Sequence, residues 1–317
     1  MHYLKASALA ACLLLMDQMA FAAQCLYVSS YHSGYAWSDG VERGLHQALD
    51  GKCEITTFYM DTKRNKDEAQ IKQAALRVKH MIDRLQPDVV IAADDNAAKY
   101  LIVPYYKDAD IPFVFCGINW TVEQYGFPFS NVTGMIEVAA IEPLLKNAAA
   151  MVGKIKTAVY IGANTLTERK NYQRFKASAD KLNITISSQL VDTMEQWLQA
   201  YADAQQSDVI VIGSNAGIAD WDSATVRSML RGSSQTLSVT NHGWMMPYTM
   251  FGMTKVPEEH GHWAGQIALE IINGTRPVDI PIIPNRKFDI TINKQLLADA
   301  GIPVPEFIRL KARVYRQ

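Results

Sequence analysis

The chain has no excess of charge of either sign and only four cysteines. Its 317 residues contain 31 Lys and Arg and 32 Asp and Glu, so the net charge is −1 and nothing attracts the protein to nucleic acid. No spacing of Cys and His residues fits a zinc site. We therefore expect no nucleic-acid partner, no bound metal and no cofactor.

Sequence motifs of several enzyme classes are also missing. The chain contains no H-E-x-x-H, and Gly213-Ser214-Asn215-Ala216-Gly217 differs from the G-x-S-x-G of a nucleophile elbow. The loop after the apolar stretch Cys25–Val28 lacks the G-x-G-x-x-G spacing that lets a backbone approach a pyrophosphate. These absences argue against catalysis and against dinucleotide binding, and we expect a protein that is not an enzyme.

The first 22 residues have the three parts of a signal peptide. Lys5 supplies a positive charge, Ala6–Met16 is an apolar stretch too short to span a membrane, and Ala20-Phe21-Ala22 is a small-x-small cleavage site. Leu9-Ala10-Ala11-Cys12 also resembles the cleavage box of a bacterial lipoprotein, but almost no apolar stretch precedes the cysteine. We expect cleavage after Ala22 and export to the periplasm, with lipidation of Cys12 as the less favoured alternative.

Apolar stretches alternate with amphipathic ones along a chain whose 49% hydrophobic content can bury two cores. A first series of predicted strands, with helices between them, comprises Cys25–Val28, Cys53–Tyr59, Asp88–Ala93 and Ile111–Cys116. A second series comprises Thr157–Ile161, Ile184–Leu190 and Asp208–Ile212. This alternation is typical of a parallel sheet with helices on both faces, so the sequence predicts an α/β protein of two doubly wound parallel-sheet lobes.

The last third of the chain does not simply extend the second lobe. It contains a predicted strand at Thr236–Val239, an extended stretch at Pro247–Gly252, a helix at Pro257–Asn273 and a strand at Phe288–Ile292. An isolated strand and helix after a complete sheet indicate that the chain crosses back between the lobes. We assign residues 1–22 to the signal peptide, 23–135 and 246–284 to lobe one, and 136–245 and 285–317 to lobe two.

Three cysteines follow the predicted cleavage site. Cys25 and Cys53 open the first two strands, which are neighbours in a sheet of order 2-1-3, so their side chains can come within bridging distance in an oxidising compartment. We predict a disulfide between them. Cys116 lies within an apolar stretch, where a buried, unreactive thiol is expected.

The residues after the first strand are unusually rich in aromatic and polar side chains. In an open α/β sheet this loop borders the ligand crevice, because connections there diverge to opposite faces of the sheet. A loop that only turns the chain would contain Gly, Asn, Asp or Pro rather than three large aromatics and a histidine. The alternative is an aromatic plug that covers the core. Similar polar or aromatic residues follow the other predicted strands, and the candidate ligand-binding residues are Tyr31, His32, Tyr35, Trp37, Asp61, Asp95, Asn96, Asn119, Glu137, Asn164, Ser214, Asn215, Asn241, His242 and Trp244.

Several of these positions also have structural interpretations. Asp94 and Asn96 can cap the following helix, which makes Asp95 the better ligand candidate of the three. His32 and His242 can be hydrogen-bonded structural histidines. Trp37 and Trp244 can be packing residues, although an aromatic ring beside carboxylates also recognises an amine or a flat ring. His260 and His262 face different sides of their helix, so we do not expect them to share a metal ion.

Parts of the sequence resemble the type I periplasmic substrate-binding proteins. The resemblance lies in Asn131-Val132-Thr133-Gly134, in Glu259–Ile272 with the following Asn273–Pro281, and in Ala300-Gly301-Ile302-Pro303-Val304-Pro305. More narrowly, the sequence resembles the ABC-transporter substrate-binding family that includes tryptophan and tyrosine binders. The opening Ser30–Asp39 resembles a subgroup that also occurs as extracellular sensor regions of histidine kinases. The resemblance implies two lobes joined by three crossings, with the ligand held between them.

These observations lead to two functional hypotheses. The first is a monomeric periplasmic protein that delivers a small polar or aromatic, amino-acid-like solute to the membrane permease of an ABC importer. The second is a soluble sensor of the same fold that signals to a membrane histidine kinase. A neighbouring permease and ATPase gene pair would favour transport, and a neighbouring kinase gene would favour signalling.

Overall fold

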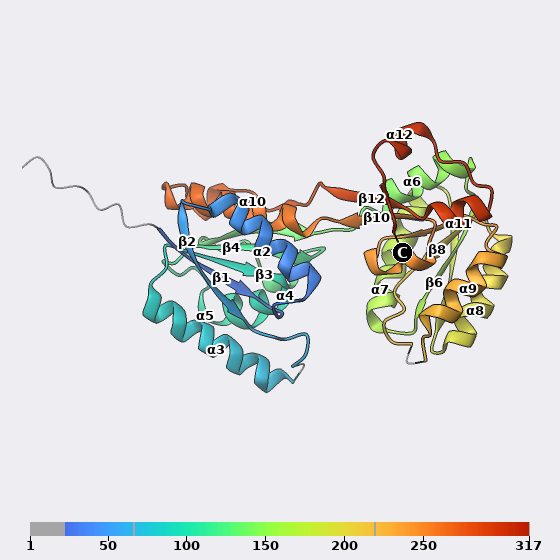
Figure 1. Cartoon of the computed structure of the whole chain (residues 1–317). Coiled ribbons are helices and arrows are strands. Elements are labelled where there is room, and N and C mark those ends of the chain that lie inside the picture. Colours follow the sequence, from blue (N-terminus) through green and yellow to red (C-terminus); the bar gives the residue numbers. More distant parts are fainter. Residues whose placement is uncertain (1–22, 66, 219, 317) are drawn as a thin grey trace, which may run out of the picture. The chain divides into compact units, whose positions relative to one another are not determined.

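The structure is a computed structural model that describes residues 23–65, 67–218 and 220–316, and the predicted signal peptide lies outside these residues. The chain forms two compact units (Figure 1). Unit 1 contains residues up to 118, 122–134 and 261–282, and unit 2 contains residues 119–121, 135–260 and 283–317. The main crossings between the units therefore lie at 134/135, 260/261 and 282/283.

The first sheet has six strands in the order β11-β5-β4-β3-β1-β2. Its strands are β1 (Ala23–Ser29), β2 (Cys53–Tyr59), β3 (Val89–Ala93), β4 (Phe113–Asn119), β5 (Val132–Glu137) and β11 (Ile283–Pro284). The pairs β1–β2, β1–β3 and β3–β4 are parallel. All five residues of β3 are buried, as expected for a central strand covered on both faces.

The helices of unit 1 lie between these strands, and the chain later returns to pack one more helix against them. The helical segments are α2 (Ala36–Leu49), α3 (Glu68–Leu85), α4 (Asp94–Ala97), the π-helical η1 (Ala98–Ile102), α5 (Val103–Tyr105), η2 (Glu123–Tyr125), α10 (Pro257–Ile272) and η5 (Pro277–Asp279). α10 approaches α2 closely through Gly261 and Gly265. A Cβ atom at Gly261 would overlap the backbone of Val41, and one at Gly265 would lie 2.7 Å from Ala48 Cβ. The two glycines therefore permit this helix contact.

A disulfide joins Cys25 to Cys53 in unit 1, and their Cα atoms are 5.9 Å apart. It links β1 to β2 near the amino ends of both strands, at the edge of the sheet opposite to the strand ends that hold the candidate ligand-binding residues. Cys116 is buried in the same core cluster.

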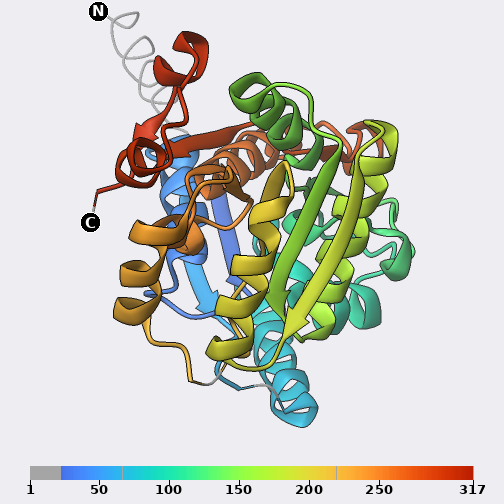
Figure 2. The ribbon, with the colours of Figure 1, turned by 90° about the vertical axis from the view of Figure 1, so that its right-hand side faces the viewer.

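The second sheet has seven strands in the order β13-β12-β10-β9-β8-β6-β7. Its strands are β6 (Thr157–Ala163), β7 (Thr185–Val191), β8 (Val209–Ile212), β9 (Ser238–Thr240), β10 (Phe251–Lys255), β12 (Phe288–Ile292) and β13 (Arg313–Val314). β6 and β7 pair in parallel over seven residues and run side by side in Figure 2. β10 and β12 are antiparallel.

The helices of unit 2 surround a core that includes Trp197, Tyr160 and Phe175. They are α6 (Ile141–Val152), α7 (Leu166–Lys181), α8 (Met194–Asp203), η3 (Ala204–Gln206), α9 (Ser223–Ser233), η4 (Gly243–Tyr248), α11 (Lys294–Asp299) and α12 (Glu306–Arg309). The sequence analysis missed α9, whose Ser- and Arg-rich stretch buries only Val226 and Leu230 in its middle and end. It also predicted an extended chain from residue 247, whereas η4 continues to Tyr248.

The structure confirms an α/β fold with two sheets of mainly parallel strands. One long segment and two short ones, residues 119–121 and 283–284, lie in unit 2 although the sequence analysis placed them in lobe one. Residues 246–260 were assigned to lobe one, but they belong to unit 2, because β10 pairs with β9 and β12 of the second sheet. Within the described residues, no helix is both long enough and apolar enough to cross a membrane.

Candidate functional site

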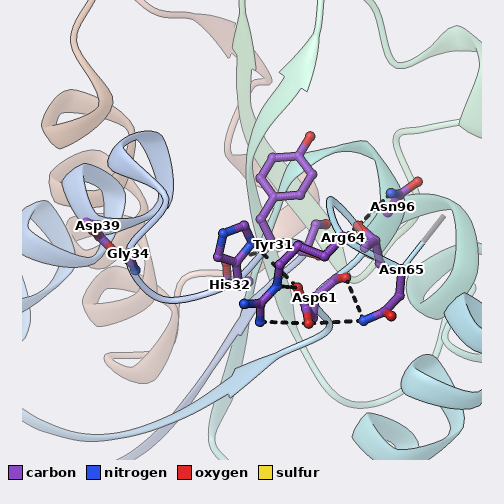
Figure 3. A network of polar contacts seen from close by, with 11 residues as sticks. Tyr31, His32, Gly34, Asp39, Asp61, Arg64, Asn65 and Asn96 are labelled. Atoms are coloured by element: carbon purple, nitrogen blue, oxygen red, sulfur yellow. Dashed lines mark hydrogen bonds and ion pairs between the residues drawn. The ribbon is translucent and has the colours of Figure 1, made fainter.

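In each unit, candidate residues lie near the carboxyl ends of the strands. In unit 1, Asp61 follows β2 and is the centre of a polar cluster (Figure 3). Arg64 binds its carboxylate through two hydrogen bonds, of 2.7 and 2.8 Å, and Asn65 donates a third of 3.0 Å. His32 Nδ1 lies 3.5 Å from Asp61 Oδ1. The hydrogen bonds and charge of Arg64 lower the pKa of Asp61, so this carboxylate is already well compensated.

The aromatic residues after β1 form a second cluster around a lysine. The rings of Tyr31 and Tyr35 meet edge to face with their centroids 5.3 Å apart. Lys63 Nζ lies 4.5 Å from the centroid of Tyr31 and 5.1 Å from that of Tyr35. Such distances are typical of cation–π contacts, so the two tyrosines already interact with a cation of the same unit.

Trp37 does not lie in a loop, because α2 begins at Ala36. Its indole Nε1 donates a hydrogen bond of 3.1 Å to Asp94 Oδ1, and the half-buried ring packs against the core of unit 1. Asp94 is buried and has φ +68°, and Gly117 next to it has φ +78°. A Cβ atom at Gly117 would come within 2.9 Å of the Asp94 carboxylate, so this glycine leaves the room that the carboxylate occupies.

The residues after β3 are tied to their neighbours by hydrogen bonds. Asn96 Nδ2 donates to Thr62 Oγ1 at 2.8 Å, and the Tyr125 hydroxyl donates to Asp95 Oδ1 at 2.7 Å. Burial and the Asp95 carboxylate raise the pKa of Tyr125. The capping interpretation of Asp94 and Asn96 is wrong, because the residue before α4 is Ala93 and no side chain caps this helix.

In unit 2, the ends of β8 and β9 meet above a buried carboxyl group. Glu168, in the first turn of α7, is 1% exposed. Its Oε2 accepts hydrogen bonds from the Tyr160 hydroxyl at 2.5 Å and from the backbone N–H of Ser214 at 2.8 Å. Burial raises the pKa of Glu168, although both hydrogen bonds oppose the rise. A Cβ atom at Gly162 or Gly213 would collide with Glu168 Oε2, so the two glycines provide its space.

Hydrogen bonds extend from Glu168 to two of the predicted ligand-binding residues. Asn171 Nδ2 donates to the Tyr160 hydroxyl oxygen at 2.8 Å, and Asn241 Nδ2 donates to Asn171 Oδ1 at 3.3 Å. His242 Nε2 lies 3.5 Å from Asn171 Nδ2 and 3.8 Å from Glu168 Oε1. Burial, with a smaller effect of the Lys255 charge, lowers the pKa of His242 to about 3. The imidazole is therefore neutral near pH 7.

Trp244 gives this face of unit 2 an exposed aromatic surface. Its ring stacks on His242 with a centroid distance of 4.5 Å and an angle of 29°, and 57% of the residue is exposed. The Arg174 guanidinium lies 4.2 Å from the ring centroid of Trp120 in the same unit. Stacked rings and a cation on an aromatic face are the contacts with which proteins bind flat solutes.

The remaining predicted residues of unit 2 do not join this cluster. Asn164 is exposed and donates to Asp192 at 3.3 Å. Glu137 is buried and forms an ion pair with Lys255. Asn119 is exposed at the end of β4, and Asn215 lies in the turn after β8. Among the described residues, no group of three or more His, Cys, Asp and Glu side chains could hold a metal ion.

The sequence analysis missed Glu168, Asn171 and Tyr160. Thr165 and Glu168 have the T-x-x-E spacing of a capping box, and Thr165 Oγ1 does accept the Glu168 N–H at 3.2 Å. That motif predicts a Glu side chain that reaches back to the N-cap, whereas this one turns toward Tyr160 and Ser214. The i, i+3 spacing of Glu168 and Asn171 was a signal that both side chains share one helix face.

Solved structures with low sequence identity share this fold. The ABC domain in complex with L-Trp from Streptococcus pneumoniae is 17% identical, with TM-score 0.62 and coverage of 92% of this chain and 99% of that one. The ligand-free, open structure of CD0873, a substrate binding protein with adhesive properties from Clostridium difficile, is 14% identical, with TM-score 0.75 and coverage of 93% and 99%. A conserved domain protein from Vibrio cholerae is 18% identical, with TM-score 0.61 and coverage of 93% and 100%. No curated protein matches the chain.

The fold is that of the type I periplasmic binding proteins. The family model described as ABC transporter substrate binding protein matches residues 26–315, and the chain belongs to this family. Its members are solute-binding proteins that are usually extracellular or periplasmic, which implies a small-molecule ligand and a membrane transporter partner.

Proposed function

We propose that this protein binds a small polar or aromatic, amino-acid-like solute in the periplasm and delivers it to the permease of an ABC importer. The solute would contact strand-end residues of both units. The observation that supports this most directly is the cluster at the ends of β8 and β9, where Ser214, Asn241 and His242 converge beside the exposed ring of Trp244. Such a mixture of a few fixed polar atoms with an aromatic surface is typical of small-molecule sites.

A thermal-shift screen over amino acids, nucleosides and sugars tests solute binding. A solute present at 100 times its Kd stabilises a protein by about 2.7 kcal/mol, so a true ligand should raise the melting temperature clearly. Titration calorimetry on the compounds that do so gives the affinity. The proposal predicts amino acids or related aromatic compounds among them. If sugars alone stabilise the protein, the proposed solute class is wrong, and if nothing does, the binding function fails.

We favour transport over signalling to a histidine kinase, because the family is that of ABC transporter substrate-binding proteins. Deletion of the gene should abolish uptake of the radiolabelled solute at concentrations near the Kd. A sensor would instead leave uptake intact and remove a transcriptional response to the solute.

The mature protein is proposed to be a monomer that begins at residue 23. Mass spectrometry of the exported protein gives the new N-terminus, and a diacylglycerol mass on Cys12 would show lipidation instead. Light scattering coupled to size exclusion gives the molar mass of the particle in solution, and a dimer mass would contradict the monomer.

A further inference from the structure

Within the described residues the two sheets end in four edge strands, and three of these edges are protected. β11 and β13 have only two residues each, and they contain Pro284 and Arg313. β2 is longer, but it carries the charged Glu54 and is joined to its neighbour by the disulfide between Cys25 and Cys53. Short strands, proline and charged side chains are features with which proteins prevent a sheet edge from pairing with another chain.

β7, the fourth edge strand, lacks these features. Its seven residues, Thr185–Val191, contain no charged side chain and no proline, and all seven pair in register with β6. Ser187, Ser188 and Gln189 in the middle of the strand are exposed. Because successive side chains point to opposite faces of a sheet, β7 is open on both faces there. β7 is therefore a long, uncharged and open edge.

The backbone of β7 presents hydrogen-bonding groups along this edge. At the start of the strand the Thr185 N–H donates to the Lys156 carbonyl at 2.8 Å, and at its end the Val191 carbonyl accepts from the Asn164 N–H at 2.8 Å. Since the backbone groups of successive strand residues alternate in direction, every second residue from 185 to 191 bonds to β6. The residues whose N–H and C=O groups point away from β6 are Ile186, Ser188 and Leu190.

Most of these outward groups are available to another chain. Within the part of the chain that the structure describes, only the Ile186 carbonyl has a partner, the Tyr172 hydroxyl at 3.2 Å. A carbonyl oxygen has two lone pairs, so the Ile186 carbonyl can accept a second hydrogen bond.

The sequence of β7 is complementary to itself in the antiparallel direction. A two-fold axis at Ser188 places this residue opposite its own copy, Ile186 opposite Leu190, Ser187 opposite Gln189, and the two β-branched end residues opposite each other. Like side chains then face one another, and such cross-strand pairs stabilise sheets. The same register places the outward N–H and C=O groups of residues 186, 188 and 190 opposite one another, which is the hydrogen-bonded arrangement of an antiparallel pair.

The charges beyond the ends of β7 favour the same direction. Lys181 is exposed before the strand, and Asp192 and Glu195 are exposed after it. Asp180, next to Lys181, already forms an ion pair of 2.9 Å with Lys176. Antiparallel pairing brings the basic end of one strand next to the acidic end of the other, whereas parallel pairing in register brings like charges together.

We propose that β7 is an interface for a second copy of this chain, whose own β7 adds in the antiparallel direction and extends the second sheet across a two-fold axis at Ser188. Each copy contributes one seven-residue strand and its flanks, whereas stable complexes bury about 800 Å² from about 20 to 30 residues on each side. The pairing is therefore weak, with a Kd above about 100 µM. The protein is a monomer in dilute solution, as proposed above, and dimerises when concentrated. This inference is independent of solute binding.

Sedimentation equilibrium of the mature protein from about 10 µM to about 1 mM tests the self-association. We expect the mean mass to rise above that of the monomer by at least about a quarter at the highest concentration, and a constant monomer mass overturns the proposal. Ser188→Lys places a charge opposite its own copy and should abolish the rise without lowering the melting temperature, because Ser188 is exposed at the edge. A dimer that persists in this variant uses another surface, which also overturns the proposal.

Two exposed serines provide a matched test of the register. Ser188→Cys lies opposite its own copy, and Cα atoms of such a pair are about 5.5 Å apart, within the range of a disulfide. Ser187→Cys lies diagonal to its own copy at more than about 7 Å, too far to be bridged. Under mild oxidation Ser188→Cys should form a covalent dimer at least tenfold faster than Ser187→Cys. The native cysteines do not interfere, because two are bridged and Cys116 is buried. Equal rates overturn the axis.

A mixture of two variants checks the register independently. Ser187→Cys and Gln189→Cys face each other across the proposed axis, so together they should form a mixed covalent dimer at least tenfold faster than either forms a dimer with itself. Parallel pairing would instead join each variant preferentially to its own copy, and that result would overturn the proposed interface.

Discussion

The strand-end faces of the two units use their polar groups differently. In unit 1 neighbouring side chains stabilise the charged groups. Arg64 forms two hydrogen bonds to the Asp61 carboxylate, and two tyrosine rings lie within cation–π distance of Lys63. In unit 2 a buried chain of hydrogen bonds ends at Asn241 Oδ1, which has no hydrogen-bond partner among the described residues. Unit 1 also has such an atom, His32 Nδ1, which lies 3.5 Å from Asp61 Oδ1. The two faces therefore differ in how their charged groups are held rather than in whether unpartnered atoms occur.

The two networks should contribute differently to stability, because their side chains differ in solvent exposure. Asp61 is 25% exposed at its side chain, and exposed ion pairs contribute about 1 kcal/mol or less. The Glu168 side chain is 2% exposed, and buried polar networks lose much more when one member is removed. Under the proposed function, unit 1 would thus contribute mainly aromatic rings to a solute, whereas unit 2 would contribute fixed polar atoms.

The largest difference between the units should follow removal of each central carboxyl group. Glu168→Ala leaves the Tyr160 hydroxyl and the Ser214 N–H buried without an acceptor, and should lower the free energy of unfolding by about 3 kcal/mol. Asp61→Ala breaks exposed contacts and should cost about 1 kcal/mol or less. Urea unfolding of both variants measures the two values. Equal losses would show that the two networks do not differ as described.

Removal of the disulfide should destabilise unit 1 selectively. Cys25 and Cys53 are 28 residues apart, and cross-links of such loops contribute about 3 kcal/mol. The double variant Cys25→Ser, Cys53→Ser should therefore lower the melting temperature of unit 1 while solute contacts in unit 2 stay intact. Calorimetry with and without solute measures both. Free thiols at both Cys25 and Cys53 in the non-reduced wild-type protein, detected by mass spectrometry, would contradict this pairing.

Two substitutions of Trp37 in unit 1 distinguish the contribution of its hydrogen bond from that of its aromatic ring. Trp37→Phe keeps a ring but removes the hydrogen bond from Nε1 to Asp94, and should cost about 2 kcal/mol of stability with nearly unchanged solute affinity. Trp37→Ala also removes the ring, and solute binding should weaken by about 1 to 3 kcal/mol if the ring stacks on the solute. Unchanged affinity of Trp37→Ala would make this tryptophan purely structural.

The pH dependence of stability should reveal the buried histidines of unit 2. The pKa values of His242 and His260 are lowered from 6.5 to about 3 by burial. Between these values the unfolded chain binds a proton at each histidine that the native protein does not bind. The free energy of unfolding should therefore rise with pH from about 3 to 6.5, by up to about 1.4 kcal/mol per pH unit for each histidine.

The variant His242→Phe should lose one of the two histidine contributions to the slope of the unfolding free energy against pH. Glu168 acts in the opposite direction, because its raised pKa means that the native protein keeps a proton that the unfolded chain releases above about 4.5. The lowered pKa of Asp61 matters only below its unfolded value of 3.8. An identical slope for His242→Phe and the wild type would contradict a neutral, buried His242.

Much of the fold was predictable because it depends on local patterns. The short apolar run at residues 89–93 predicted a buried strand, and β3 is buried throughout. α9 was not predictable in this way, because its sequence has few apolar residues and its formation depends on packing of Val226 and Leu230. The pairing of β10 with β9 and β12 likewise depends on tertiary contacts, which no local sequence pattern specifies.

The same distinction applies to the candidate site. The rule that ligands lie at the carboxyl ends of parallel strands led to Asn241 and His242, which the structure does bring together with Ser214. It could not lead to Tyr160 or Glu168, because these residues lie below the strand ends and are joined only by the folded sheet. Their importance depends on burial, which the sequence does not state.

The space around the Glu168 carboxylate has an evolutionary consequence. A side chain at Gly162 or Gly213 would occupy the position of Oε2, so neither glycine can mutate while the glutamate remains. Loss of the glutamate relieves the closest contact at Gly162, but a Cβ atom at Gly213 would still lie 2.4 Å from the Tyr160 hydroxyl oxygen. Among descendants of this sequence, substitutions at Gly162 should therefore appear only on branches where residue 168 has already become smaller, and substitutions at Gly213 only where residue 160 has changed as well. This order of events can be read from a family tree.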